Sequence, residues 1–217
     1  MGIVNFSIPK DLVLKFIDFK RIDNFIETGT YKGETSFWAA NHFKNVYTIE
    51  IDPKISKETK SKSDCPKNIE FLVGNSKDVL PELVENNLSG TCFFWLDGHW
   101  CMGAGGKEDE CPLLKELEAI KSIQNAIIFI DDARCFLGPL PAPHESSHWP
   151  RIDQIFNNIS FLFPEHRFTI QDDVIMVVPI NYMTVLDEHW KLTFNERYYS
   201  KKKLRFIGKI RKRLRIL

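Results

Sequence analysis

Short apolar segments recur along the first 130 residues, and segments with helical periodicity fill the intervals between them. Five apolar segments are rich in β-branched and aromatic side chains, which is typical of strands: residues 25–27, 46–51, 69–73, 92–96 and 126–130. Helical patterns cover residues 34–42, 53–62, 77–87 and 111–123. Because such alternation requires right-handed crossovers, the sequence predicts a parallel, doubly wound α/β sheet that binds ligands at the carboxyl ends of its strands.

The alternation stops after residue 130. Residues 151–159 have a helical pattern, and residues 167–170 and 174–178 flank a polar turn, which predicts a closing antiparallel hairpin. A chain of 217 residues with 43% hydrophobic content can bury one substantial core. We therefore expect a single domain over residues 1–200, followed by a tail over residues 201–217.

Charge is distributed unevenly along the chain. There are 29 basic and 29 acidic residues, but nine of the basic residues and none of the acidic ones lie in residues 201–217. Apolar residues recur every three or four positions between these charges, which predicts a cationic amphipathic helix. Our leading hypothesis is peripheral attachment to an anionic membrane. The alternatives are docking on the acidic body of the same or another subunit, contact with nucleic acid, and disorder.

Cysteine usage and the N-terminal sequence indicate the compartment. The five cysteines are scattered without CxxC spacing, which favours reduced thiols in the cytoplasm over a disulfide framework. The first 20 residues contain no unbroken apolar stretch, so we expect neither a signal peptide nor a membrane-spanning helix. The expected location is the cytoplasm, with the basic tail on the inner face of the membrane.

A glycine-containing motif, Glu27-Thr28-Gly29-Thr30-Tyr31-Lys32-Gly33, follows the first predicted strand. Glycines allow a sharp turn and close approach to a ligand, and the free N–H groups of the next helix face that ligand. The G-x-x-x-G spacing differs from the G-x-G-x-x-G of dinucleotide-binding proteins, in which a pyrophosphate sits on the helix end. The motif therefore favours a cofactor without phosphates and disfavours an NAD-dependent enzyme.

Polar residues also follow the second and third predicted strands. Glu50 ends the second strand, and a carboxylate there can accept both hydrogen bonds of a ribose diol. Gly74-Asn75-Ser76 follows the third strand, where small polar residues can meet the edge of an adenine. This order predicts a site for a nucleoside-containing cofactor.

Three aspartates follow the fourth and fifth predicted strands, in Trp95-Leu96-Asp97-Gly98-His99 and Phe129-Ile130-Asp131-Asp132. If those strands are neighbours, the carboxylates converge, and they repel one another unless they bind a cation or have raised pKa values. Oxygen ligation with room for water suits Mg²⁺, with Mn²⁺ or Ca²⁺ as substitutes. The alternative is that these aspartates are solvated or cap the following helices.

Over residues 24–134 the chain resembles the class I S-adenosylmethionine-dependent methyltransferases, and especially metal-dependent O-methyltransferases of the catechol and macrolide-sugar kind. The resemblance implies a Rossmann-like, seven-stranded, mostly parallel sheet with an antiparallel last strand and helices on both faces. It also implies the site residues: Glu27, Thr28, Gly29, Thr30, Tyr31 and Gly33 with Asp97 for the methionine end, Glu50 for the ribose, Gly74, Asn75 and Ser76 for the adenine, and Asp97, Asp131 and Asp132 for the metal.

The chain differs from this family at the position of the catalytic base. Catechol-type enzymes carry a lysine shortly after the first metal aspartate, whereas this chain has His99 and Trp100 there. We assign His99 to catalysis together with Asp97, because a histidine titrates near working pH. A structural role for His99 stays open, and His144 and His148 are alternative bases. A bound metal would lower the pKa of an acceptor hydroxyl and align that hydroxyl with the sulfonium methyl group.

The predicted function is S-adenosylmethionine-dependent, divalent-metal-assisted O-methyl transfer. The membrane-seeking tail favours a sugar hydroxyl of a glycan, nucleotide-sugar or lipid-linked precursor as the acceptor. A small catechol-type acceptor, RNA, and a silent cofactor-binding scaffold are the alternatives. Nucleic acid is disfavoured, because Asp97-Gly98-His99-Trp100 lacks the proline platform that base-amino methyltransferases use for a flipped base. Assembly into a homo-oligomer is also open.

Overall fold

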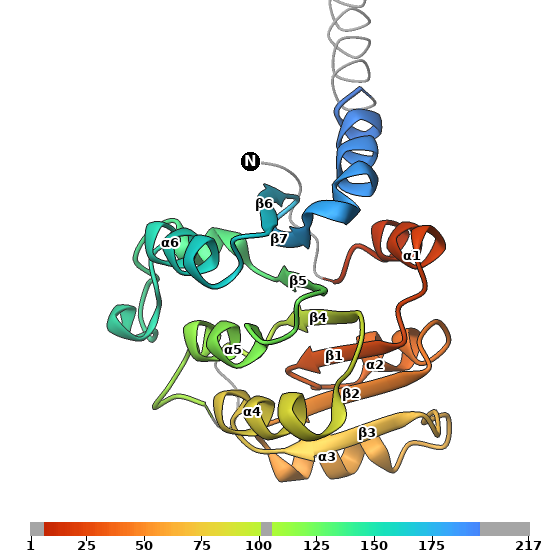
Figure 1. The fold of residues 1–217 in the computed structure, drawn as a ribbon. Coiled ribbons are helices and arrows are strands. Elements are labelled where there is room, and N and C mark those ends of the chain that lie inside the picture. Colours follow the sequence, from red (N-terminus) through yellow and green to blue (C-terminus); the bar gives the residue numbers. More distant parts are fainter. Residues whose placement is uncertain (1–6, 101–105, 196–217) are drawn as a thin grey trace, which may run out of the picture. The chain divides into compact units, whose positions relative to one another are not determined.

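The computed structural model describes residues 7–100 and 106–195. Seven strands form one sheet (Figure 1): β1 Asn24–Thr28, β2 Asn45–Glu50, β3 Ile69–Val73, β4 Cys92–Leu96, β5 Ala126–Ile130, β6 His166–Gln171 and β7 Val174–Pro179. Their order is β3-β2-β1-β4-β5-β7-β6, and β7 runs antiparallel to both of its neighbours. This confirms the predicted doubly wound sheet and its antiparallel last strand.

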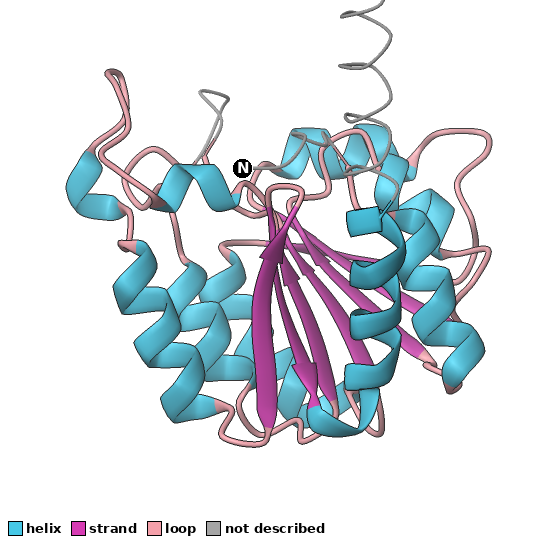
Figure 2. Ribbon diagram, turned by 90° about the horizontal axis from the view of Figure 1, so that it is seen from above, coloured by secondary structure: helices cyan, strands magenta, loops and turns pink. Residues whose placement is uncertain are grey.

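Helices alternate with the first six strands along the chain, and Figure 2 shows them on both faces of the sheet. They are α1 Lys10–Phe19, α2 Glu34–Ala39, α3 Pro53–Lys60, α4 Ser76–Asn87, α5 Leu113–Ile120 and α6 Ile152–Leu162. Sequence analysis did not predict α1. Its signal is nevertheless present, because Leu12, Val13 and Phe16 share one helical face and are fully buried.

Two apolar layers enclose the sheet. On one face, Phe25, Phe93 and Phe129 form an aromatic layer, against which Phe16 of α1 packs edge-on at 5.9 Å from Phe129. The other face belongs to a separate cluster of buried aliphatic and aromatic side chains, including Leu80 of α4, Leu117 of α5 and Ile155 of α6. Burying one such large side chain stabilises the fold by about 1.5–3 kcal/mol.

The strand register determines where the polar residues meet. Thr28 pairs with Ile49 and with Leu96, and Leu96 in turn pairs with Ile130. The loops that follow β1, β4 and β5 therefore start at the same level of the sheet. This alignment places the glycine motif and the three predicted aspartates along one edge.

The chain divides into two compact units, Met1–Ile180 and Asn181–Leu217. The second unit contains a helix over residues 183–195, and the predicted boundary at residue 200 and the predicted amphipathic tail lie outside the described residues. Within the part of the chain that the structure describes, no helix combines the length and apolar character needed to cross a bilayer.

Candidate active site

A cavity of about 700 Å³ lies at the carboxyl ends of the parallel strands. Its walls bring together ten of the residues predicted for the site: Gly29, Tyr31, Glu50, Gly74, Asn75, Ser76, Asp97, His99, Asp131 and Asp132. Four others, Glu27, Thr28, Thr30 and Gly33, do not line it. The cavity thus joins the predicted cofactor residues to the predicted catalytic ones.

The turn after β1 depends on Gly29. This residue has a φ of +87°, and a Cβ atom placed on it would lie 2.4 Å from the carbonyl oxygen of Asp97. Its N–H donates to the carbonyl of Ile49 over 2.9 Å, which ties the turn to the end of β2. Only glycine combines this backbone conformation with such close approach, so the predicted role of Gly29 in a tight turn is confirmed.

Glu27 lies beneath the turn, buried to 2% exposure. Its Oε2 atom accepts hydrogen bonds from Ser36 and, over 2.8 Å, from Thr48. Burial raises the pKa of Glu27 to about 8, although these two hydrogen bonds act in the opposite direction. Glu27 therefore joins β1 to α2 and β2, and its predicted contact with the methionine end of a cofactor stays a prediction.

Glu50 is oriented by two backbone donors. Its Oε2 atom accepts from the N–H of Tyr31 over 2.8 Å, and its Oε1 atom accepts from the N–H of Asp52 over 3.1 Å. Each carboxylate oxygen has a second lone pair, so the side chain can still accept from a diol in the cavity. The arrangement preorganises an acceptor site that is 7% exposed.

The loop after β3 closes the far end of the cavity. Asn75 is the N-cap of α4, and its side chain accepts from the N–H of Lys77 over 3.3 Å. Behind this loop lies Glu116 of α5, a fully buried acid that sequence analysis missed. Burial raises the pKa of Glu116, while hydrogen bonds from Ser76 and Thr28 oppose that shift.

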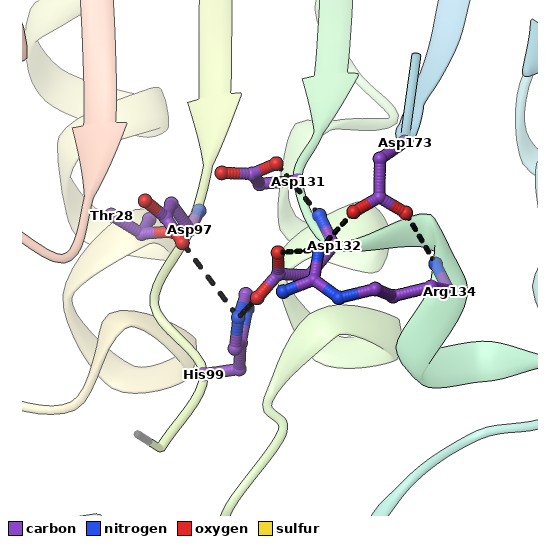
Figure 3. A network of polar contacts seen from close by, with 7 residues as sticks. All are labelled: Thr28, Asp97, His99, Asp131, Asp132, Arg134 and Asp173. Atoms are coloured by element: carbon purple, nitrogen blue, oxygen red, sulfur yellow. Dashed lines mark hydrogen bonds and ion pairs between the residues drawn. The ribbon is translucent and has the colours of Figure 1, made fainter. Parts of the chain in front are cut away.

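The three predicted aspartates converge, as Figure 3 shows. Asp97 follows β4, where its N–H donates to the carbonyl oxygen and the hydroxyl of Thr28 over 3.2 Å each. Asp131 follows β5 and accepts from the N–H of Asp132 over 2.7 Å. Asp132 adopts a left-handed conformation with a φ of 54°, which turns the chain directly after the strand.

His99 lies among these carboxylates. Its Nε2 atom is 2.8 Å from Oδ2 of Asp132 and 3.7 Å from Oδ1 of Asp97, and its side chain is 6% exposed. Its ring also packs edge-on against Trp149, with 5.4 Å between centroids. His99 is thus positioned by an acid and an aromatic ring at the wall of the cavity.

Arg134 and Asp173 complete the network, and sequence analysis assigned no role to either. The guanidinium of Arg134 pairs with Oδ1 of Asp132 at 2.5 Å and also with Asp173, which comes from the β6–β7 turn (Figure 3). The backbone N–H of Arg134 donates to Asp173 over 2.8 Å. A basic residue two positions after an acidic pair was the available signal for Arg134, whereas Asp173 is 39 residues away in sequence.

The carboxylates differ in their electrostatic state. Burial, reinforced by neighbouring carboxylates, raises the pKa of Asp97 to about 6 and that of Asp131 to about 7. Burial acts in the same direction on Asp132, but His99 and Arg134 outweigh it and hold the pKa of Asp132 below its ordinary value. His99 and Arg134 therefore offset the cost of burying the Asp132 carboxylate fully, whereas the cost of burying Asp97 and Asp131 is offset incompletely.

The predicted metal site stays a prediction. Among residues 7–100 and 106–195, no group of three or more His, Cys, Asp or Glu side chains has the arrangement of a metal site. The chemistry of the donors is nevertheless suitable, because burial and the neighbouring Asp132 raise the pKa of Asp97, burial and the neighbouring Asp97 raise that of Asp131, and a divalent cation would relieve the repulsion between the carboxylates.

A buried acid holds together the wall beside His99. Glu110, 1% exposed, accepts from Trp149 Nε1 over 2.7 Å, from the N–H of Glu145 over 2.9 Å and from His144 Nδ1 over 3.0 Å. Its carbonyl oxygen accepts from the N–H of Trp100, which lines the cavity. His144 is thereby held at Glu110, and Trp149 is packed at 8% exposure.

No family model matches the chain, and no curated protein matches its sequence. Solved structures do match its fold. It is similar to the O-methyltransferase TomG from Streptomyces achromogenes, involved in tomaymycin synthesis and solved in complex with S-adenosylmethionine, at 15% identity and a TM-score of 0.52, covering 81% of this chain and 82% of that chain.

Two further structures match in the same way. A proposed caffeoyl-CoA O-methyltransferase from Staphylococcus aureus has 15% identity and a TM-score of 0.56, covering 81% of this chain and 86% of that one. A proposed methyltransferase from Streptococcus mutans, in complex with S-adenosylhomocysteine, has 14% identity and a TM-score of 0.52, covering 81% and 100%. At these identities the likeness concerns the fold.

Proposed function

Because the chain has the class I methyltransferase fold, we propose that it is an S-adenosylmethionine-dependent O-methyltransferase. One observation carries the proposal: a single cavity joins Gly29, Glu50 and Asn75 to Asp97, His99 and Asp131. A cofactor held at the first group would present its sulfonium toward the second. The distribution of residues matches a donor site and an acceptor site that share one space.

The cofactor end fits the donor's chemistry. The Gly29 turn lets the backbone approach a ligand closely without a phosphate-binding spacing, and the Glu50 carboxylate can accept from both ribose hydroxyls. Exposed Ile51 and half-buried Ile55 line the cavity and provide apolar contact for a base. These features support S-adenosylmethionine over a dinucleotide.

At the acceptor end we propose that His99 takes the proton of the acceptor hydroxyl. The resulting imidazolium would be stabilised by Asp132, whose carboxylate lies 2.8 Å from Nε2. Arg134 keeps Asp132 ionised and oriented for this task. General-base assistance of this kind contributes about 10²–10⁴-fold to rate.

We propose Mg²⁺, or Mn²⁺ in its place, as the cation that Asp97, Asp131 and Asp132 would hold. A bound divalent ion would supply Lewis acidity toward the acceptor hydroxyl. The carboxylates would supply oxygen ligands whose ionisation is unfavourable without a cation, because burial and neighbouring carboxylates raise the pKa of Asp97 and Asp131. For the acceptor we propose a sugar hydroxyl of a glycan, nucleotide-sugar or lipid-linked precursor, with a catechol as the second candidate.

The test is an acceptor screen that is read by mass spectrometry as the gain of one methyl group. Methyl glycosides, nucleotide-sugars, catechols and RNA would be incubated with S-adenosylmethionine in Mg²⁺, in Mn²⁺ and in EDTA. We expect methylation of a sugar in the presence of either metal. Methylation of RNA alone would overturn the acceptor, and full activity in EDTA would overturn the metal.

We also propose peripheral attachment to an anionic membrane. Trp190, Leu192 and Phe194 are exposed in residues 181–195, and the nine basic residues of the tail follow. In co-sedimentation with phosphatidylglycerol vesicles, the full chain should bind and a chain ending at residue 200 should bind much less. Equal binding by both would contradict the role of the tail. The control is Phe161→Ser, which removes an exposed aromatic side chain on α6, 82% exposed, and should leave vesicle binding unchanged.

A further inference from the structure

We propose that Asp109 reads the base of the cofactor and makes the site selective for a 6-aminopurine. This inference rests on the proposed function, because it assumes a nucleoside cofactor in the cavity. Asp109 lies in the loop between β4 and α5, a segment to which no cofactor role was assigned, and it lines the cavity together with Gly74, Asn75 and Ser76.

Contacts with two residues place the Asp109 carboxylate at the outer end of the cavity. Its Oδ2 atom accepts from Asn75 Nδ2 over 3.4 Å and pairs with Lys77 Nζ at the first turn of α4. Both partners follow β3, the strand farthest along the sheet from the three aspartates. Asp109 is therefore held at the end of the cavity opposite the acceptor, beyond the ribose position at Glu50.

The other carboxylate oxygen is available to a ligand. Among the described residues, none donates a hydrogen bond to Oδ1 of Asp109, although the carboxylate is only partly exposed, with 35% of the side chain accessible. The lining of the same cavity also contains Ile51, Ile55 and Pro112, which can contact the faces of a planar base. An acceptor beside an apolar slot is the arrangement that recognises an exocyclic amine.

The chemistry of the bases then sets the selectivity. The 6-amino group of adenine donates a hydrogen bond to a carboxylate, whereas the 6-oxo group of hypoxanthine presents an acceptor to it. A site built around an ionised acceptor discriminates against the ligand that leaves that acceptor unpaired. Asn75 cannot provide this selection by itself, because its amide keeps one N–H donor and one carbonyl lone pair beyond its bonds to Asp109 and the N–H of Lys77, and so can pair with either a 6-amino or a 6-oxo group.

A competing explanation is that Asp109 only fastens its loop to α4 through Lys77. The two explanations differ in what Asp109→Asn does to base preference. If Asp109 only anchors its loop, its replacement lowers the affinity for every cofactor equally. If it contacts the base, its replacement changes the ratio of the affinities for an adenosine and an inosine ligand. Lys77→Met removes the ion pair and keeps the carboxylate, so it isolates the fastening effect.

Calorimetry of the full chain with S-adenosylhomocysteine and S-inosylhomocysteine tests the inference. We expect the wild type to prefer the adenosine ligand by at least about 10-fold, and Asp109→Asn to shrink that preference at least about 5-fold. Lys77→Met should weaken both ligands alike. Glu108→Gln, an exposed change in the same loop, is the matched control and should change neither affinity.

An unchanged preference ratio in Asp109→Asn would overturn the base contact, whether the two affinities stay the same or fall together. Thermal melting of each variant without ligand separates a loss of binding from a loss of folding. If the wild type bound neither ligand, the proposed function itself would fail. The two failures are therefore distinguishable in one data set.

Discussion

The carboxylates at the two ends of the cavity have opposite electrostatic surroundings. At the cofactor end, two backbone N–H groups orient Glu50, at 2.8 and 3.1 Å. At the acceptor end, burial and neighbouring carboxylates raise the pKa of Asp97 to about 6 and that of Asp131 to about 7, and only Asp132 is compensated fully by His99 and Arg134. The cofactor end is thus preorganised for neutral hydroxyls, whereas the acceptor end holds repulsion that a proton or a cation relieves.

The largest expected effect is at the cofactor end. Glu50→Ala removes the proposed acceptor of both ribose hydroxyls, and hydrogen bonds to a charged group contribute about 1.5–3 kcal/mol each. We expect the affinity for S-adenosylhomocysteine, measured by calorimetry, to fall about 30-fold or more. Asp131→Asn, at the other end, should leave it within about 3-fold. If the two variants lost affinity equally, the division of the cavity into two ends would be wrong.

A smaller effect is expected on stability at the acceptor end. The pKa of Asp131 rises on folding from an ordinary 3.8 to about 7, so between these values the folded state keeps a proton that the unfolded state has released. Stability therefore falls as pH rises through that window. In EDTA at pH 8, Asp131→Asn should be more stable than the wild type by about 1–3 kcal/mol, and the difference should shrink toward pH 4.

Urea unfolding at several pH values measures this difference. Asp18→Asn, an exposed change on α1, is the matched control and should show no such pH dependence. Destabilisation by Asp131→Asn at pH 8 would contradict the prediction, because it would mean that neighbouring groups stabilise the ionised carboxylate of Asp131.

The smallest effect concerns the cation. At pH 8, 10 mM Mg²⁺ should raise the melting temperature of the wild type by a few degrees, since a ligand with a Kd near 1 mM stabilises by about 1.4 kcal/mol at that concentration. Asp97→Asn combined with Asp131→Asn should remove the shift. NaCl at matched ionic strength controls for screening. A shift of the same size in both proteins would place the ion elsewhere.

Much of the fold could be predicted because the strand and helix periods alternate clearly. The strand-end positions of Gly29, Glu50, Asp97 and Asp131 followed from topology, since parallel strands end at one edge. The helix α1 was missed because charged residues alternate with apolar ones along this part of the sequence and conceal the face that Leu12, Val13 and Phe16 form. The helical spacing of apolar residues therefore indicates a helix even where charged and apolar residues are mixed along the sequence.

The remaining site residues could not be predicted, because distant pairings create their roles. Arg134 depends on Asp173 in the hairpin turn, and Glu110 gains its importance only when the loop containing Trp149 folds over it. Asp109 meets Lys77, from which it is 32 positions away in sequence. None of these pairs has a characteristic spacing, so only the folded chain brings them together.

The contact between Gly29 and the carbonyl of Asp97 interlocks the loops after β1 and β4. Neither loop can shift without displacing the other, because no side chain separates the two backbones. Evolution of a new acceptor preference would therefore leave these loops in place. Diversification is expected instead in the segment over residues 133–150, which is joined to this edge through Glu110 and can change its surface while the loops after β1 and β4 keep their positions.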